Sequence, residues 1–260
     1  MVNSQNEPAS KWVYGPAARA FRLVTEEIVL AGLTERATFS LIQLPTLLSF
    51  IRSESKHKIL KNHKQLERLH AMSLEDAEFA KKEVEAGFSR LHIHSIMSLW
   101  SFVEACLEDT AVALIKKCNK SDLCQGSVLF EHANDLPILD DQAALRFKRK
   151  FLNIVKDSIR SNFMLSFEIF FKCFDINLNN QQDTLNKMQE INSLRNCALH
   201  RSKIVDDYAL LMSPEIPFKV GEEIIINTQQ YNLYMSAIGD YILNFHNKIL
   251  QSKYMTMRND

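Results

Sequence analysis

The feature that most limits how this chain can fold is its shortage of turn-forming residues. It has six glycines and six prolines among 260 residues, whereas average usage puts these two types together at about 12%. Sheet-rich and loop-rich folds need both types for their turns. The prolines also leave two long proline-free spans, 46–136 and 138–213. We therefore expect an all-α protein built as a helical bundle.

Charge and apolar content narrow the classes of function. Lysine plus arginine equals aspartate plus glutamate, 31 each, which argues against a bulk nucleic-acid coat or a polybasic membrane binder but allows a local basic groove. The sequence contains no run of about eighteen apolar residues. Its beginning, "MVNSQNEPAS", has no signal-like apolar core. We expect a cytoplasmic protein that does not associate with membranes.

The cysteines and histidines do not have the spacing of a metal site. The five cysteines form an odd set without a CxxC pair, at positions Cys106, Cys118, Cys124, Cys173 and Cys197. We expect reduced and mostly buried thiols. No carboxylate or cysteine shares the spacing of His57, His63 and His70, so we interpret these as solvated helix-face residues. The sequence thus predicts no metal and no cofactor.

The N-terminal part of the chain has sequence signals for helices but few residues that suggest a functional site. Pro16 suits the first turn of a helix that would end at Gly32. A second helix is predicted over 35–45, with Thr34 as its N-cap. The "SLED" sequence at 73–76 has the spacing of a capping box and predicts the start of a further helix.

Apolar periodicity predicts the remaining helices. They cover about 88–117, 142–159, 163–174, 183–200 and 228–249, with a loop over 118–140. The 163–174 segment is apolar nearly all round and should be a central buried helix. Residues 216–227, "IPFKVGEEIIIN", have β-branched and aromatic runs around a glycine and predict a short β-hairpin-like insertion or an extended excursion before the last helix.

We divide the chain into three parts on these patterns. Residues 1–85 form an N-terminal helical extension, 86–255 a helical domain, and 256–260 a tail.

The stretch with the most chemical content is "SLRNCALHRSKIVDD", which begins at residue 193. Arg195 and Asn196 are adjacent, and His200 follows at the end of an amphipathic helix. Glu104 falls on or beside the apolar stripe of the 88–117 helix. A carboxylate facing a core needs a cation or hydrogen-bond donors, so Glu104 either reaches water at the edge of the stripe or meets an arginine from another helix.

In this motif and in its helix order, residues 86–255 resemble the HEPN (higher eukaryotes and prokaryotes nucleotide-binding) domain family. The family hallmark is an arginine, commonly followed by a polar residue, with a histidine four to six intervening residues later; the matching positions are Arg195, Asn196 and His200. The resemblance implies a compact helical bundle that pairs as a homodimer. Many members are metal-independent endoribonucleases whose arginine and histidine from both protomers line one cleft.

The residue types suit this chemistry. RNA carries its own nucleophile, the 2′-hydroxyl, so a histidine can move protons while an arginine holds the phosphate and an asparagine orients either one. One histidine per chain is too few for both acid and base roles, and a two-fold axis would supply the second. The resemblance therefore implies an RNA-cleaving toxin or defence effector, with an antitoxin or regulatory protein as a possible partner. Candidate RNA-binding residues are Arg146, Lys148, Arg149, Lys150, Arg201 and Lys203.

Two features depart from the family pattern. Ser202 stands where some family members in toxin–antitoxin pairs carry a tyrosine that the partner modifies. Arg195 and His200 lie about 140° apart on an ideal helix, which makes a second protomer more necessary. The alternative interpretation is a non-catalytic RNA-binding, nucleotide-binding or protein-interaction module, in which Arg195 pairs with Glu104 as a structural ion pair and His200 caps the helix.

Overall fold

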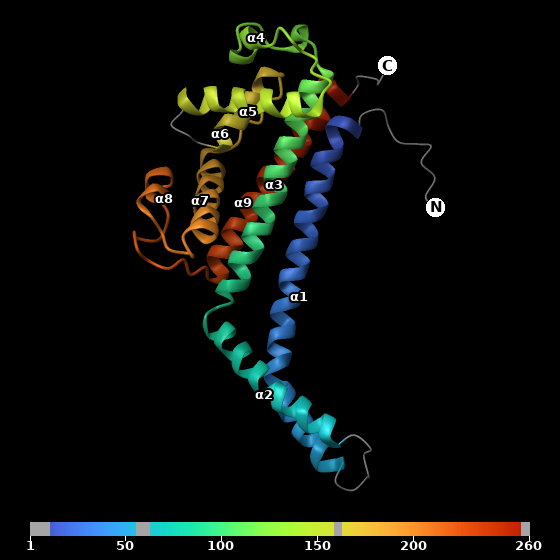
Figure 1. Cartoon of the computed structure of the whole chain (residues 1–260), viewed down its shortest axis with the longest axis vertical. Coiled ribbons are helices and arrows are strands. Elements are labelled where there is room, and N and C mark those ends of the chain that lie inside the picture. The colour runs from blue at the N-terminus through green and yellow to red at the C-terminus, as the bar shows by residue number, and fades with distance from the viewer. Residues whose placement is uncertain (1–10, 56–62, 159–162, 256–260) are drawn as a thin grey trace, which may run out of the picture. The chain divides into compact units, whose positions relative to one another are not determined.

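The structure is a computed structural model, and it describes residues 11–55, 63–158 and 163–255. These residues are all-α and include no strand, which confirms the predicted class. The helices are α1 (Lys11–Ser55), α2 (His63–Glu85), α3 (Ser89–Lys117), α4 (Val128–His132), α5 (Asp141–Ser158), α6 (Phe163–Cys173), α7 (Gln182–His200), α8 (Asp207–Met212) and α9 (Thr228–Gln251) (Figure 1). Two short 3-10 turns cover Lys120–Asp122 and Lys253–Met255. The predicted tail, 256–260, and His57 lie outside the described residues.

The chain forms two compact units, and helices α1, α3 and α9 each contribute to both. Of the described residues, unit 1 contains 11–25, 96–158, 163–224 and 233–255. Unit 2 contains 26–55, 63–95 and 225–232. The units therefore do not part at residue 85. The reason is burial, since Ala17, Ala20 and Val24 near the start of α1 are buried in unit 1.

Helix α1 does not stop where the sequence predicts. It runs without a break through Gly32 and Pro45, and Pro16 is buried in its interior rather than placed in its first turn. A glycine inside a helix costs about 1 kcal/mol relative to alanine, and an interior proline costs about 3 kcal/mol. The stop predicted at Gly32 and the separate 35–45 helix are therefore wrong, because the rest of a 45-residue helix outweighs these local penalties.

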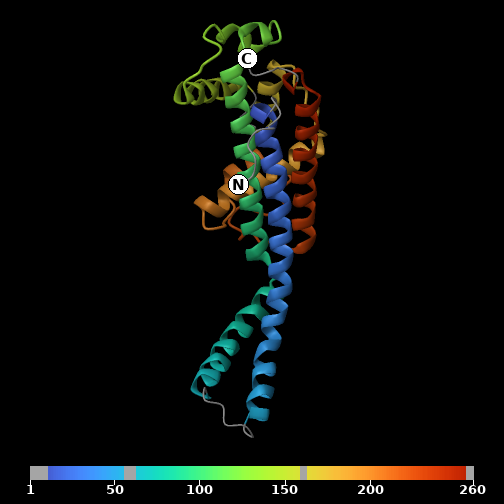
Figure 2. The ribbon, with the colours of Figure 1, turned by 90° about the vertical axis from the view of Figure 1, so that its right-hand side faces the viewer.

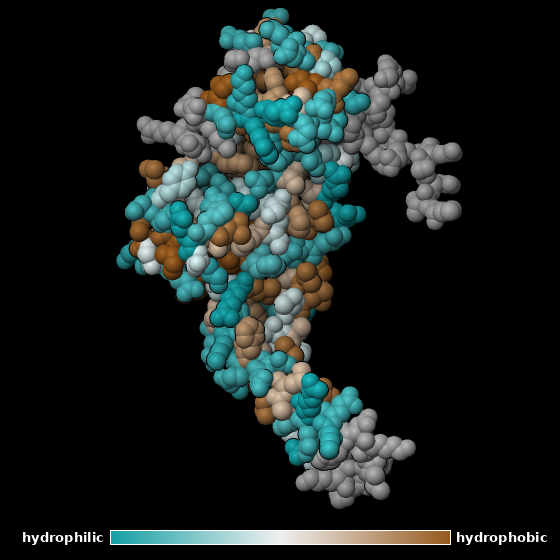
Figure 3. Space-filling model, viewed as in Figure 1, coloured by the Kyte–Doolittle hydropathy of each residue, from teal (hydrophilic) through white to brown (hydrophobic). Residues whose placement is uncertain are grey.

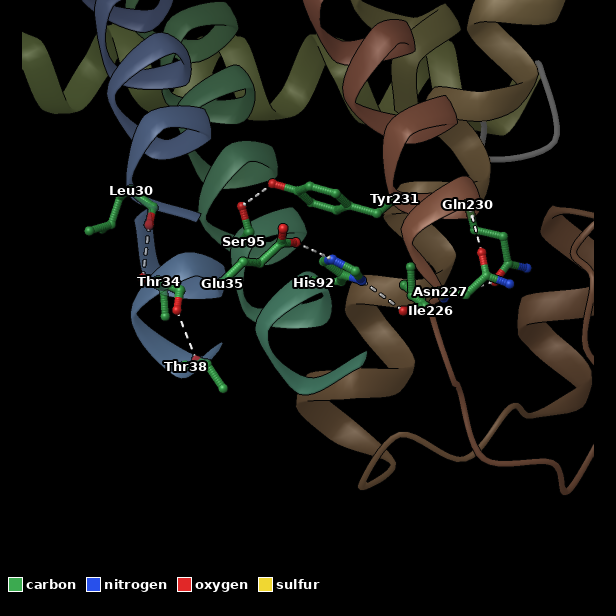
Figure 4. Close-up of polar contacts among 10 residues, drawn as sticks. All are labelled: Leu30, Thr34, Glu35, Thr38, His92, Ser95, Ile226, Asn227, Gln230 and Tyr231. Atoms are coloured by element: carbon green, nitrogen blue, oxygen red, sulfur yellow. Dashed lines mark hydrogen bonds and ion pairs between the residues drawn. The ribbon is translucent and has the colours of Figure 1, made fainter. Parts of the chain in front are cut away.

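The capping signals in this part of the chain are also overridden. Thr34 donates its hydroxyl to the Leu30 carbonyl oxygen at 2.8 Å, one turn back in α1 (Figure 4). Ser73 likewise lies inside α2 and donates to the His70 carbonyl oxygen at 2.7 Å. Serine and threonine hydroxyls can bond to the preceding turn as well as cap a helix, so these residues do not begin new helices.

In unit 2, α2 runs back alongside the second half of α1 (Figures 1 and 2). Phe39 of α1 meets Phe88, just before α3, with ring centroids 5.5 Å apart and edge-to-face geometry. An exposed ion pair joins Arg52 and Glu67 at 3.4 Å.

Across the described residues, no helix combines the length and apolar character needed to cross a membrane.

The core of unit 1 is built around α6, which is the central buried helix that the sequence predicts. Phe167, Phe170 and Phe171 have no exposed surface. Phe170 packs edge-to-face on Phe151 of α5 at 5.5 Å, and Phe171 does so on Phe245 of α9 at 5.1 Å. Such aromatic pairs contribute about 0.5–1.5 kcal/mol beyond the apolar area that they bury. Helix α7 packs against both α6 and α8.

The segment between α7 and α9 consists of turns and irregular chain around the short helix α8. The predicted hairpin within 216–227 does not form: a single antiparallel bridge joins Ile204 to Glu223 instead. Val205 donates its backbone N–H to Glu222 at 3.0 Å and accepts from Gly221 at 2.8 Å. This part of the insertion therefore pairs with the chain that follows α7 rather than with itself.

Candidate functional site

Helix α7 carries the Arg-x4-His motif and ends at it, close to the predicted bounds. Its apolar face, which includes Met188, Ile191 and Leu194, is buried in unit 1 and fixes the rotation of the helix. Helical bonding stops at His200 because Ser202 and Lys203 adopt positive φ angles of 51° and 67°. Helices commonly end with residues in the left-handed backbone conformation. The motif therefore lies in the last turns of α7, and His200 is its final residue.

Arg195 meets Glu104, so the interpretation in which this carboxylate pairs with an arginine from another helix is confirmed. Nη2 of Arg195 on α7 lies 3.6 Å from Oε2 of Glu104 on α3, and the two side chains are 25% and 32% exposed. Nη1 of Arg195 donates to Oδ1 of Asn196 at 3.0 Å. The guanidinium is thus held between a carboxylate and an amide.

A pocket of about 570 Å³ lies between α7 and α8, and three of the predicted site residues line it. These are Asn196, His200 and Arg201. His200 is exposed at its edge. Arg195 is not among the lining residues, which agrees with the angle between positions 195 and 200 on a helix. Within one chain, Asn196 is hydrogen-bonded to Arg195 and lines the same pocket as His200.

Arg201 is positioned by the start of α8. Its Nε donates to Oδ2 of Asp206 at 3.1 Å, and Oδ1 of Asp206 accepts from the Ala209 backbone N–H at 2.9 Å as the N-cap of α8. The backbone hydrogen bond from Ala209, followed by Arg201, lowers the pKa of the Asp206 carboxyl below its usual range. The carboxylate therefore stays charged and holds Arg201 beside His200.

The predicted basic cluster on α5 needs one correction. Lys148 is only 1% exposed, and its Nζ lies 2.6 Å from Oε1 of Glu108 on α3. It is a structural ion-pair partner and is not accessible to RNA, because it falls on the face of α5 that packs on the core. Arg146, Arg149 and Lys150 are exposed, but none of them lines the pocket between α7 and α8.

Most residues that line this pocket are absent from the sequence prediction, and two of them, Gln189 and Tyr208, have chemistry suited to a ligand. Gln189 is 5% exposed, and its side-chain Oε1 has no hydrogen-bond partner in the described part of the chain. Tyr208 on α8 lines the same pocket and is 58% exposed. The signal that could have indicated Gln189 is its spacing of three from Asn192 and seven from Asn196, which places these amides along one helix face.

The cysteines are free thiols, and all but Cys124 are buried, as expected. Burial raises the pKa of the Cys106 and Cys118 thiols to about 12, so neither is poised as a nucleophile. Among the residues that the structure describes, no group of three or more histidine, cysteine, aspartate or glutamate side chains is placed to hold a metal ion.

A second polar cluster, centred on His92, lies in unit 2 (Figure 4). The buried His92 ring stacks on Tyr231, with centroids 4.4 Å apart and an interplanar angle of 10°. Its Nδ1 donates to the Ile226 carbonyl oxygen at 3.0 Å, because a carbonyl only accepts, and its Nε2 lies 3.0 Å from Oε1 of Glu35. This cluster joins α1 and α3 to the first turn of α9 and the chain just before it, so we assign it a structural role. The sequence prediction did not identify it.

Comparison of the chain with protein-family models, with curated protein sequences and with solved structures finds no match.

Proposed function

We propose that this chain is a metal-independent endoribonuclease that acts at the pocket between α7 and α8. The observation that carries the proposal is that Asn196, His200 and Arg201 line the same open pocket. Arg195 donates a hydrogen bond to Oδ1 of Asn196. These side chains supply an imidazole that can transfer protons and fixed positive charge for a phosphate. The HEPN-like position of the motif at the end of its helix supports the same function.

The proposed reaction is attack of the RNA 2′-oxygen on the adjacent phosphorus. The new P–O2′ bond forms as the P–O5′ bond breaks, which leaves a 2′,3′-cyclic phosphate and a 5′-hydroxyl. A base removes the 2′-hydroxyl proton, and an acid delivers a proton to the leaving 5′-oxygen. His200 performs one of these transfers, while Arg201 offsets the negative charge that develops at the phosphate. Arg195 acts through its hydrogen bond to Asn196, which lines the pocket.

A second copy of the chain would supply the other histidine. Phe167, Phe170 and Phe171 of α6 are buried inside unit 1, as are Tyr234 and Tyr241 of α9, so these side chains do not form a contact with a second copy. Apolar side chains gather instead on the α8 side of unit 1 (Figure 3). Leu199 at the end of α7, Leu211 on α8 and Val220 in the segment before α9 are 47%, 75% and 47% exposed, close in sequence to the pocket residues. We propose this surface as the homodimer contact.

The test is incubation of the purified protein with total RNA in EDTA. Wild type should cleave, and His200→Ala should lose on the order of a hundredfold or more in rate, because acid–base groups typically contribute about 10²–10⁴. His94→Ala is the matched control, since His94 is an exposed histidine on α3 that does not line the pocket. Cleavage that requires Mg²⁺, or that persists in His200→Ala, would contradict the mechanism.

One observation favours the alternative function, a non-catalytic binding module. Arg195 is engaged with Glu104 and does not line the pocket. In that case Arg195→Ala would lower stability, and neither wild type nor variant would cleave RNA. Retained RNA binding without cleavage would identify this alternative.

A further inference from the structure

We infer that the pocket between α7 and α8 holds one unpaired base of single-stranded RNA, adenine by preference. The Gln189 amide would read the edge of the base, and the Tyr208 ring would stack on its face. The inference deepens the proposed function and rests on it for the choice of RNA as the ligand.

Gln189 is the observation that points to a ligand. Its side chain is almost fully buried, it lines the pocket, and its carbonyl oxygen has no partner in the described part of the chain. Burying a polar oxygen without a hydrogen bond is costly, so such groups are normally satisfied. A ligand that presents an N–H donor removes this cost. A primary amide pairs in bidentate fashion with the amino group and ring nitrogen of adenine.

The neighbouring side chains continue this polar face along α7. Asn192 and Asn196 line the same pocket. Oδ1 of Asn196 accepts from Arg195, so its Nδ2 is the group that remains to donate to a ligand. Ser193, in contrast, shares a 2.9 Å hydrogen bond with Ser213 in the core and serves to hold α7 to the end of α8. The amides thus lead from Gln189 toward His200 at the open end.

Tyr208 supplies the second element of base recognition. More than half of its surface is exposed, although Ala209 beside it is buried and anchors α8. An exposed aromatic ring on a pocket wall is a stacking surface for an unpaired base, and this is how proteins commonly bind single-stranded RNA. The cavity of about 570 Å³ falls within the range of about 300–1,000 Å³ that is typical of small-ligand sites.

The arrangement places the base and the scissile phosphate at different parts of one pocket. The amides and Tyr208 hold the base, while His200 and Arg201 face the phosphate. A base in a duplex is stacked and paired, so it cannot enter. The substrate is therefore single-stranded RNA that is cut next to the bound base.

The experiment measures binding separately from cleavage. Fluorescently labelled 2′-O-methyl octamers of A, C or U cannot be cleaved, because the attacking hydroxyl is blocked, and fluorescence anisotropy reports their affinity. Wild type and His200→Ala should both prefer A to U by about tenfold or more, as expected for a bidentate amide contact. An A octamer annealed to its complement should bind more weakly than the free A octamer.

Two variants test the two contacts. Gln189→Met keeps the approximate shape and should erase the preference for A without lowering stability, since it removes an unpartnered buried group. Gln229→Met is the control, because Gln229 is an exposed glutamine on α9. Tyr208→Leu should weaken binding of every single strand by about tenfold, and an exposed ring can be replaced without loss of the fold.

The outcomes separate this inference from the proposed function. Equal affinity for A, C and U, or an unchanged preference in Gln189→Met, overturns the base pocket even if RNA is cleaved. Preference for another base overturns adenine as its occupant. Base-selective binding that depends on Gln189 upholds the inference even if wild type shows no cleavage, and in that case the ribonuclease proposal fails.

Discussion

Arg195 on α7 and Glu104 on α3 form an ion pair across unit 1, with 3.6 Å between Nη2 and Oε2. The contact fixes the guanidinium beside Asn196, whose side chain it also bonds. Asn196 in turn lines the pocket that contains His200. A residue on α3 is thereby connected to the proposed catalytic residues on α7 through two successive polar contacts.

Glu104→Gln should separate the charge of this pair from its shape. Partly exposed ion pairs contribute about 0.2–1 kcal/mol, so we expect the free energy of unfolding to fall by no more than that. The rate of RNA cleavage should fall by a larger factor than this loss of stability explains, because Arg195 loses the partner that orients it. Urea unfolding and cleavage rates measure both effects, with Glu75→Gln, an exposed position on α2, as the control. Unchanged cleavage would show that Glu104 does not orient Arg195 for the reaction.

Lys148→Ala should reduce stability and leave RNA affinity unchanged. The variant removes a buried lysine stem and leaves Glu108 without its cation, so we expect a loss of about 1–3 kcal/mol. Lys150→Ala, two residues along α5 and exposed, should change stability by less than about 0.5 kcal/mol. Chemical denaturation and RNA-binding titrations of both variants provide the measurement. A drop in RNA affinity confined to Lys148→Ala would restore it as a binding residue.

Glu168→Gln should flatten the pH dependence of stability. Burial raises the pKa of the Glu168 carboxyl, and the hydrogen bond from Asn180 offsets this only in part. A carboxyl whose folded-state pKa is raised favours folding when it is protonated, so its contribution falls as pH rises from about 4.3, the unfolded value, through the folded value. Glutamine removes this fall and keeps an acceptor for Nδ2 of Asn180, which lies 2.6 Å from Oε1.

The measurement is urea unfolding of wild type and Glu168→Gln at pH 4 and pH 7. The stability of the variant relative to wild type should increase from the lower pH to the higher. Glu131→Gln is the control, because Glu131 is exposed on α4. A difference that stays constant with pH would mean that Glu168 titrates alike in the folded and unfolded states.

Glu35→Ala should destabilise unit 2 through His92. The substitution removes the oxygen 3.0 Å from Nε2 of a histidine with no exposed surface. An unsatisfied buried polar group costs about 1–3 kcal/mol, so thermal or chemical denaturation should reveal a loss of that size. Arg36→Ala, at the next and exposed position of α1, should change stability by less than about 0.5 kcal/mol. Equal effects of the two substitutions would rule out a structural role for the His92–Glu35 contact.

Local sequence patterns correctly predicted the helices in which apolar residues recur with clear helical spacing. Helices α5, α6 and α7 lie where apolar spacing placed them. Asn227 is the N-cap of α9, and its Oδ1 accepts from the Gln230 backbone N–H at 2.9 Å. The same patterns failed in α1, where the signals at Gly32 and Thr34 did not end or begin a helix. A single capping or propensity effect is worth about 1 kcal/mol, and a long helix outweighs it.

The sequence by itself determined the all-α class, the end of α7 and the residue types of its motif, because helix periodicity and helix ends depend on neighbours a few positions away. Only the tertiary structure decided that Arg195 pairs with Glu104 and that Lys148 is buried. It also decided that Gln189 lines a pocket while its Oε1 has no hydrogen-bond partner among the described residues. Those outcomes depend on which helices pack together and how each is rotated. Residues distant in the chain set that rotation through the shape of the shared core.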